Sequence, residues 1–457
     1  MAKAISKLSK RTVTAAAAAV LLAGALAGCG GGGSANGGAG STAQGAGSDP
    51  QAAGKTVELR FSWWGAQERH DRTLKMIEKF EELHPNIKIE PEYSAFGAYQ
   101  EKLATQIAGS NAPDIMSMSL IYIQGYAQRG VLKDMTPYVG KTLNTDGLNQ
   151  ELLANMGTIN GELVGLPLSQ SASVLFYNSE MLKQAGAEAP KPDMTYDEYF
   201  ELMRDLKGKL GEGKYGTNDM AGLFEAFMYY LFSKGDVLYK DGQLAYKDEN
   251  LKEWLEMWDR ARKEGIVPPA SETASYQLAT YDPAKEPILK GTVAFEGPLF
   301  VPYYTAMEGM LKDKLEMTTI PRASGSTGTA SVLLPGIFLC INENTKHPEE
   351  AALFADFMIN STEAADILEL ERGLPDNRKM VEYLKPKFTE VDNKMLDMLT
   401  YIGDHNPGWY DGGPKGSGEV SQLFEQIVQK QQFGKATVDE VVAEFRKEAD
   451  KVLSKNG

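Results

Sequence analysis

Tryptophan side chains at two places in the chain are suited to binding a sugar ring. Trp63 and Trp64 fall where a predicted strand ends, and the carboxyl edge of an open α/β sheet is where ligands bind. A flat aromatic face there can stack on a sugar, although we expect one of the pair to pack in the core. Trp409 lies in the Gly- and Pro-rich loop 404–413, where a large aromatic side chain has little core to fill. This placement favours contact with a ligand.

Residue patterns that mark common enzyme and cofactor sites are missing or out of place. Gly211, Gly213 and Gly216 have the spacing of a dinucleotide-binding loop, but they follow a Lys-rich helical segment, which is typical of a surface turn. The signatures of ATPases, serine hydrolases and zinc proteases are absent from the sequence. Cys340 lies in an apolar run and is expected to pack as a small hydrophobe. A glycosidase needs only two suitably placed carboxylates, so that enzyme class stays open.

Composition narrows the choice further. The chain has 457 residues, 42% of them hydrophobic and 24% charged, which is typical of a soluble globular protein of two or three domains. With 47 Lys and Arg against 62 Asp and Glu, the net charge is −15. Such a surface does not suit nucleic-acid binding. The two cysteines and four scattered histidines predict neither a disulfide framework nor a metal site.

The N-terminal segment has the pattern of an export signal. A basic start at 3–11 precedes an apolar run at 13–26, which is too short to cross a bilayer as a helix. The sequence Leu26-Ala27-Gly28-Cys29 then resembles the bacterial lipobox, which implies a lipoprotein signal peptide at 1–28 and lipidation of Cys29. Residues 29–54 are rich in Gly, Ala and Ser and predict a flexible tether. We therefore expect a protein that is anchored to the membrane without spanning it.

Beyond residue 55, the hydrophobic pattern alternates between strand and helix periods. Apolar residues alternate at 57–61, repeat at helical spacing at 76–83 up to Pro85, and alternate again at 87–89, which predicts β-α-β. A helical stripe at 99–107 and a short apolar run at 113–116 follow. The order predicts an α/β fold with a parallel sheet covered by helices. Further predicted elements are a strand at 174–177, a helix from a Thr195/Glu198 capping box through 206, a helix at 251–262, a β-like run at 332–341 broken at Pro335-Gly336, a helix at 349–358 and a last helix capped by Thr437 and Glu440.

Short motifs throughout 55–457 resemble those of extracellular solute-binding proteins of family 1, the sugar-binding lipoproteins of bacterial ABC importers. Their order along the chain carries the resemblance more than any single motif does. The motifs are Trp63-Trp64 after the first strand, Phe80 to Pro85 before Ile87, Leu103 to Ile115, Gly165-Leu-Pro167 before Phe176-Tyr177-Asn178, Thr195 to Tyr199, Gly291 to Pro298, Ile341-Asn342 before Lys346 to Ala352, and Gly373-Leu-Pro375.

The resemblance implies an α/β fold of the two-lobed, type II periplasmic-binding-protein kind. Each lobe is expected to be a helix-covered, mainly parallel sheet, and a hinge that the chain crosses more than once joins the lobes. Matching the motifs places one lobe at 55–169 plus 336–372 and the other at 170–335 plus 373–457. The ligand would lie in the cleft between them.

Binding residues carried over motif by motif come from both lobes. The family often has an aromatic residue directly after the Gly-Pro pair that stands here at Gly297-Pro298. This chain has Leu299 and Phe300 at that place. The implied ligand-binding residues are Trp63, Trp64, Gln67, Ser117, Ser119, Gln170, Ser173, Tyr230, Glu296 and Trp409. For Tyr230, which neighbours Phe227 and Tyr229 on a predicted helix, packing in the core is the usual alternative.

The opening from Trp63 to Lys75 is similar to that of binding proteins for pectin fragments, notably rhamnogalacturonan oligosaccharides. Arg69, His70 and Arg72 are then candidates for pairing with a uronate carboxylate, which a guanidinium binds through two parallel hydrogen bonds. The alternative is that they are solvated charges in the first turns of a helix.

The resemblance as a whole implies a monomeric receptor that is not an enzyme and needs no cofactor. It would capture an oligosaccharide at the extracytoplasmic face of the cell membrane and deliver it to ABC permease subunits, with a cytoplasmic ATPase behind them. Two alternatives stay open. One is a secreted lipoprotein glycoside hydrolase or lyase, and the other is a family member that binds a non-sugar solute such as a polyamine or a phosphate ester.

Overall fold

The computed structural model describes residues 56–277, 285–311, 314–405 and 413–456. From Gly54 onward the chain forms a compact unit of its own. The predicted signal peptide at 1–28, Cys29, the tether at 29–54 and Trp409 lie outside the described residues. Within the described ranges, no helix has both the length and the apolar character that crossing a membrane requires.

The elements follow one another much as the hydrophobic periods predict. The strands are β1 (Val57–Trp64), β2 (Ile87–Ser94), β3 (Ile115–Met118), β4 (Thr158–Ile159), β5 (Glu162–Leu163), β6 (Leu166–Asn178), β7 (Tyr215–Thr217), β8 (Tyr239–Lys240), β9 (Gln243–Leu244), β10 (Val293–Phe300), β11 (Leu315–Thr319) and β12 (Leu333–Ile341). The helices are α1 (Gln67–Leu83), α2 (Phe96–Ala108), α3 (Leu120–Gln128), α4 (Gln150–Leu152), α5 (Ser179–Gln184), α6 (Tyr196–Lys207), α7 (Phe224–Ser233), α8 (Asp248–Glu264), α9 (Ala270–Gln277), α10 (Tyr303–Leu311), α11 (Pro348–Asn360), α12 (Thr362–Leu368), α13 (Arg378–Leu384), α14 (Glu390–His405), α15 (Ser417–Gln432) and α16 (Val438–Asn456).

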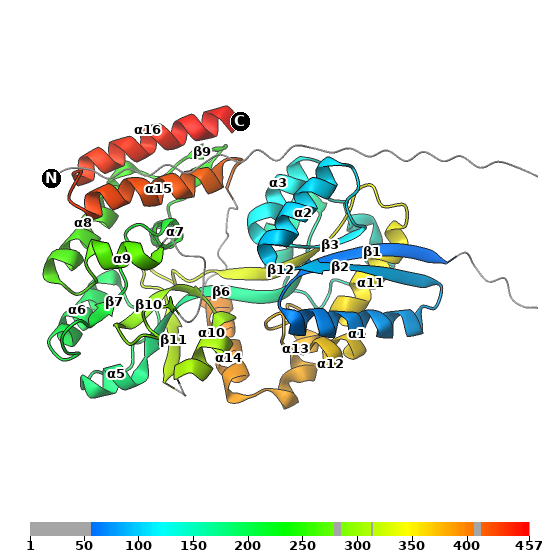
Figure 1. Ribbon diagram of the computed structural model, residues 1–457, viewed down its shortest axis with the longest axis horizontal. Helices are drawn as coiled ribbons and strands as arrows, with labels where there is room; N and C mark the ends of the chain where they lie inside the picture. Colours follow the sequence, from blue (N-terminus) through cyan, green and yellow to red (C-terminus); the bar gives the residue numbers. More distant parts are fainter. Residues whose placement is uncertain (1–55, 278–284, 312–313, 406–412, 457) are drawn as a thin grey trace, which may run out of the picture. The chain divides into compact units, whose positions relative to one another are not determined.

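A mixed eight-stranded sheet organises the chain (Figure 1). Its order is β2-β1-β3-β12-β6-β10-β7, and β11 pairs with β6 beside this path. The pairs β1–β2, β1–β3 and β10–β7 are parallel, as expected for β-α-β units. The long strands β6 and β12 run antiparallel to each other and to their other neighbours. They join the two parallel parts, and helices cover the sheet as the α/β prediction requires.

The residues of β3 and β12 alternate between two hydrophobic cores on opposite faces of the sheet. Ile115 and Leu339 belong to one core, which α1 and α11 cover with residues such as Phe80. Met116 and Cys340 belong to the other, which α2 and α3 cover. Cys340 is fully buried, and burial raises the pKa of its thiol far above the ordinary value, so it is the packed small hydrophobe that was predicted.

The three predicted lobe boundaries lie close together in space. They fall inside β6 after Ser169, inside β12 at Gly336, and in the segment just after Arg372. Ser169 forms a β-bridge with Pro375, and a Cβ added to Gly336 would lie 2.6 Å from the Ser169 Oγ atom. The pairing of β12 with β6 shifts register around Pro335, so the predicted break is a bulge within one strand.

Local sequence signals set several element ends. Thr195 and Glu198 form the predicted capping box of α6, with the Glu198 amide N–H donating to the Thr195 Oγ1 atom. Thr437 and Glu440 make the same exchange before α16. Gly211 and Gly213 take positive φ values in a turn that leads into β7 rather than a helix, which does not fit a dinucleotide-binding loop.

Candidate ligand-binding site

The carboxyl ends of β2, β1 and β3 form one edge of the sheet, where parallel strands present side chains and loops to a ligand. The Gly65 amide N–H donates to the Ser94 carbonyl oxygen at 3.2 Å and ties the first two ends together. This edge carries Trp64, Gln67 and Ser119, three of the predicted binding residues.

The two tryptophans of this edge have different environments. Trp63 is 0% exposed, and its indole Nε1 donates to the His70 Nδ1 atom at 3.1 Å. Trp64 is partly buried, and its ring centroid lies 5.4 Å from those of both Phe96 and Tyr99. As expected, one of the pair packs in the core, and Trp64 is the one that keeps accessible surface.

The basic residues of α1 are already paired within the protein. The Arg69 Nε atom donates to the Glu371 Oε1 atom at 2.7 Å, and its Nη1 atom donates to the Trp64 carbonyl oxygen at 3.3 Å. Arg72 pairs with Glu68 and with Glu369. These arginines therefore attach α1 to the segment that precedes Gly373, instead of being free first-turn charges.

His70 is a buried neighbour of Trp63 rather than a charged ligand group. Burial, followed by the positive charge of Arg69, lowers the pKa of its imidazole below 6.5. The ring also packs at 4.3 Å from the ring of Tyr93. A neutral imidazole that accepts the Trp63 hydrogen bond has no charge to offer a uronate.

The other predicted residues of this edge occupy polar positions. Gln67 is exposed, and its Nε2 atom donates to the Asp71 Oδ1 atom at 2.8 Å. Ser119 is partly buried at the N-cap of α3, and no cap hydrogen bond from its side chain is found there. Ser117 is buried, and its carbonyl oxygen accepts the Tyr99 hydroxyl at 2.6 Å.

Four predicted residues lie along β6, α7 and β10. The Ser173 hydroxyl is 2.6 Å from that of Tyr229, and Tyr230 is 2% exposed within an aromatic core. Glu296 is 4% exposed and accepts the Ile288 amide N–H at 2.8 Å. Burial and the neighbouring Glu286 raise the pKa of Glu296 well above its ordinary range. Gln170 is partly buried, at the crossing of β6.

In this conformation, five of the predicted residues have almost no surface to offer a ligand. These are Trp63, Ser117, Ser173, Tyr230 and Glu296. Accessible surface remains on Trp64, Gln67, Arg69, Ser119 and Gln170. The buried set comes from strands and a core helix, so the motifs do not say which neighbouring side chain points outward.

A cavity of about 630 Å³ lies beside this region. It is bordered by Arg69 and Glu371 on one side and by Tyr303 at the start of α10 on the other. A Cβ added to Gly373, whose φ is +93°, would lie 3.7 Å from the Pro302 Cγ atom. A ligand-sized space is therefore bordered by elements from both predicted lobes.

Tyr303, which borders this cavity, and Glu225, whose charge acts on it, have no counterpart in the predicted set. Glu225 is exposed to solvent, yet the surrounding protein raises the pKa of its carboxyl, which fits a position in a concave region. Desolvation, and then the charge of Glu225, raises the pKa of Tyr303. The sequence feature that could have indicated Glu225 is its place as the acidic residue in the first turn of a helix rich in aromatic residues.

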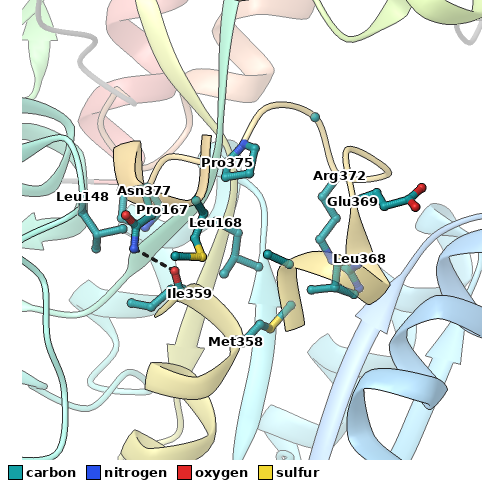
Figure 2. A pocket seen from close by; sticks show the side chains of 13 residues that line it. Leu148, Pro167, Leu168, Met358, Ile359, Leu368, Glu369, Arg372, Pro375 and Asn377 are labelled. Atoms are coloured by element: carbon teal, nitrogen blue, oxygen red, sulfur yellow. Dashed lines mark hydrogen bonds between the residues drawn. The ribbon is translucent and has the colours of Figure 1, made fainter. Parts of the chain in front are cut away.

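Two other cavities differ in size and character. One of about 660 Å³ is bordered by Gln170, Asp376 and the C-terminal part of α14. The other, shown in Figure 2, measures only about 40 Å³. Its wall includes Leu148, Met358 and Ile359, whose carbonyl oxygen accepts the Asn377 Nδ2–H at 2.8 Å. The small pocket is a packing void beneath the chain crossing, too small for a sugar ring.

Comparisons with known proteins agree with this architecture. The chain is similar to the arabinooligosaccharide-binding protein of Bacillus subtilis, with 23% identity over 86% of this chain and 93% of that protein. Among solved structures, an oligogalacturonide-binding protein of Yersinia enterocolitica superimposes with a TM-score of 0.74 at 26% identity, over 88% of this chain and all of that one. That protein was also solved with saturated digalacturonic acid.

A family 1 extracellular solute-binding protein of Alicyclobacillus acidocaldarius matches with a TM-score of 0.72 and 27% identity, over 88% of this chain and all of that one. A de novo designed esterase also matches, with a TM-score of 0.77 and 27% identity over 88% of this chain and 99% of that one; its activity was designed. The family model for bacterial extracellular solute-binding proteins covers residues 75–393. With that model matching well over half of the chain, this protein belongs to the bacterial extracellular solute-binding proteins.

Proposed function

We propose that this chain is the substrate-binding component of a carbohydrate ABC importer, which captures an oligosaccharide and delivers it to permease subunits. The observation that carries the proposal is the partly accessible ring of Trp64 at the carboxyl edge of the sheet, beside a cavity of about 630 Å³. An aromatic face suits the apolar face of a sugar ring, and polar neighbours such as Gln67 and Ser119 suit its hydroxyls. The similarity to an arabinooligosaccharide-binding protein and an oligogalacturonide-binding protein supports a sugar ligand.

The ligand would be held between two lobes, at 55–169 plus 336–372 and at 170–335 plus 373–457. The meeting of Ser169, Gly336 and Pro375 at one crossing supports a hinge there. A ligand that touches both lobes favours the closed form, because only that form makes both sets of contacts. The permease would then recognise the closed form of the receptor.

Direct contact is proposed for Trp64, Gln67, Arg69, Ser119 and Gln170, which keep accessible surface. Contact by Trp409 remains a prediction from the sequence. The buried members of the predicted set would pack behind the accessible residues and hold them in position. An aromatic core packs behind β6, the strand from which Gln170 projects, and α7.

Thermal unfolding of the purified chain with a ligand panel tests the proposal, because a ligand that binds only the native state raises the Tm. The panel contains galacturonic acid oligomers, arabinose oligomers, glucose oligomers, a polyamine and glycerol phosphate. We expect a sugar oligomer to raise the Tm and to be recovered intact by chromatography, and Trp64→Ala to reduce the shift more than Trp64→Phe. Cleavage of the sugar would instead support the hydrolase or lyase, and a shift with only the polyamine or the phosphate would support a non-sugar solute.

A uronate ligand is the finer part of the proposal. Arg69 can receive a uronate carboxylate only by sharing or releasing Glu371, whose Oε1 atom it now holds at 2.7 Å. Glu371→Gln removes this internal competitor, so digalacturonate should bind several-fold more tightly to the variant while a neutral dimer binds as before. Unchanged digalacturonate affinity would remove Arg69 from uronate recognition and leave it as a residue that positions α1.

The predicted lipid anchor can be tested separately in cells. We propose that Cys29 is lipidated and holds the chain on the extracytoplasmic face of the membrane, tethered by residues 29–54. Cys29→Ser should move the protein from the membrane fraction to the soluble extracytoplasmic fraction with its ligand affinity unchanged. A variant that stays in the membrane fraction would contradict the anchor without affecting the binding proposal.

A further inference from the structure

Phe96 is a large apolar residue that keeps much of its surface exposed. It is 42% exposed and begins α2 immediately after β2. Its neighbours Ala95, Gly97 and Ala98 are also exposed, and a Cβ added to Gly97 would meet nothing within 4 Å. The small residues leave open space around the phenyl ring. What distinguishes this exposed ring is its place next to Trp64, the residue proposed to stack on a sugar.

The ring is held in place from one side only. Its centroid lies 5.4 Å from that of Trp64, with the two planes at 71°, so an edge packs against a face. Trp64 in turn packs against Tyr99, whose hydroxyl donates to the Ser117 carbonyl oxygen at 2.6 Å. This series of contacts reaches the core of the sheet and fixes Phe96 next to Trp64.

Helix geometry places Phe96 on the same face of α2 as two buried residues. Phe96, Tyr99 and Leu103 occupy one face of α2 at positions i, i+3 and i+7. Tyr99 and Leu103 are buried, whereas Phe96, one turn earlier at the start of the helix, is exposed. The first turn of this helix face therefore presents an exposed aromatic ring beside Trp64.

We propose that Phe96 is a stacking platform for a further ring of the oligosaccharide, directly outside the ring that stacks on Trp64. This inference rests on the proposed function and extends it from one sugar ring to a chain of at least two adjacent rings. The hydroxyls of the outer ring would stay in water, since residues 95–98 are exposed, so only the apolar face of the ring needs a partner. The platform would thus add affinity for longer oligomers without demanding a particular pattern of hydroxyls.

Phe433 provides a matched control. It is the same residue type with 44% exposure, and it lies at the C-cap of α15, a helix that packs against α16 rather than on the edge of β1 and β2. Truncating either phenyl ring removes a similar amount of exposed apolar surface. If the two substitutions change oligosaccharide affinity differently, the cause is therefore where the ring lies, because both variants lose an exposed phenyl ring.

The experiment is calorimetric titration of the full chain, purified in detergent micelles, with galacturonic acid and arabinose oligomers of increasing length. For the longest oligomers, Phe96→Ala should weaken binding about threefold to tenfold, while the shortest oligomer that binds changes less than twofold. Phe96→Trp should keep the preference for length, Phe96→Leu should lose most of it because a planar face is missing, and Phe433→Ala should match the unaltered chain.

Three results would overturn the platform. If Phe96→Ala equals Phe433→Ala at every length, the ring does not touch the ligand, and the proposed function still stands because the unaltered chain binds. If Phe96→Ala weakens all lengths equally, Phe96 acts on the whole site rather than on an outer ring. If the unaltered chain binds no oligomer of any length, the proposed function fails and the platform with it.

Discussion

At the scale of single residues, Glu296 is an acid buried where a charge is costly. Its side chain receives one backbone hydrogen bond, and Glu286 lies beside it, so burial first and then this neighbour raise its pKa well above the ordinary value. A folded-state pKa that is raised in this way contributes stability below the ordinary pKa, and that stability is lost as the pH rises toward the folded pKa. The free energy of unfolding should therefore decline as the pH rises above about 4.5.

Replacement of this acid gives the first prediction. Glu296→Gln keeps an oxygen that accepts the Ile288 amide N–H but does not ionise, so the variant should be more stable than the parent at pH 7 to 8 and close to it at pH 4. Urea unfolding across this pH range measures the difference. Parallel stability profiles for parent and variant would show that Glu296 is not titrating within the fold.

Asp376 titrates in the middle of the physiological range. Its carboxylate accepts the Asn149 amide N–H at 2.9 Å and the Gln170 Nε2–H at 3.2 Å, yet burial raises its pKa from 3.8 to about 7. The side chain is 0% exposed. It borders the 660 Å³ cavity together with other charged residues, namely Asp146, Glu151, Arg378, Glu382 and Asp404.

The second prediction follows from this raised pKa. Between about pH 4 and 7 the folded state retains the Asp376 proton that the unfolded chain has already released, so stability falls by up to about 1.4 kcal/mol per pH unit. Asp376→Asn removes that titration and should flatten the dependence of Tm on pH between 5 and 7. A parent whose Tm is already flat over this interval would contradict the shift.

Burial of individual side chains was the least predictable property of the site. Period and motif placed Trp63 and Trp64 at the end of a strand, but adjacent strand residues face opposite sides, and only the packing of α1 decides that Trp63 is covered. Tyr230 was predicted from the family motif, and the fold surrounds it with Tyr196 and Trp254. Phe96 was missed because its helical spacing from Tyr99 and Leu103 does not reveal that its ring stays exposed beside Trp64.

At the scale of elements, a buried ion pair joins α8 to Asp219. The Arg262 Nη1 atom lies 2.7 Å from the Asp219 Oδ2 atom, and its Nη2 atom donates to the Gln431 Oε1 atom of α15 at 2.6 Å. Arg204 of α6 pairs with Glu264 at the same distance of 2.7 Å, but both of those side chains are largely exposed. The two pairs differ in burial and not in length, so they form a natural comparison.

This comparison is the third prediction. Arg262→Ala leaves the fully buried Asp219 carboxylate without its guanidinium partner and should lower the free energy of unfolding by about 3–5 kcal/mol. Arg204→Ala should lower it by less than about 1 kcal/mol, since solvent screens the exposed pair. Chemical denaturation measures both, and equal losses would contradict the argument that burial sets the energy of these pairs.

The elements themselves were largely predictable where a local signal exists. Hydrophobic periods predicted β1, α1 and β2, and the Thr195 and Thr437 capping boxes predicted the starts of α6 and α16. The antiparallel course of β6 between β12 and β10 was not predicted, because a largely buried strand shows little alternation. Its partners come from residues more than 100 positions later in the chain, which no local pattern encodes.

At the scale of the whole molecule, the crossing around Ser169 is the place where the proposed hinge would relate ligand binding to a change of shape. Side chains are small or missing there: Gly336 approaches the Ser169 hydroxyl, and Gly373 adopts a φ of +93° that favours glycine. Few side-chain contacts at such a crossing have to be exchanged when the lobes rotate. Trp64 lies on one proposed lobe and Tyr303 on the other, so a ligand that contacts both stabilises the form in which they are closest.

Small-angle X-ray scattering gives the fourth prediction. Saturation with an oligosaccharide that raises the Tm should reduce the radius of gyration of the parent, because the closed form is more compact. Trp64→Ala, at ligand concentrations that restore saturation, should show the same reduction, since it weakens one contact without altering the crossing. A parent that binds the sugar with an unchanged radius of gyration would mean that one lobe holds the ligand alone, and the permease would then have to recognise the sugar itself rather than a closed receptor.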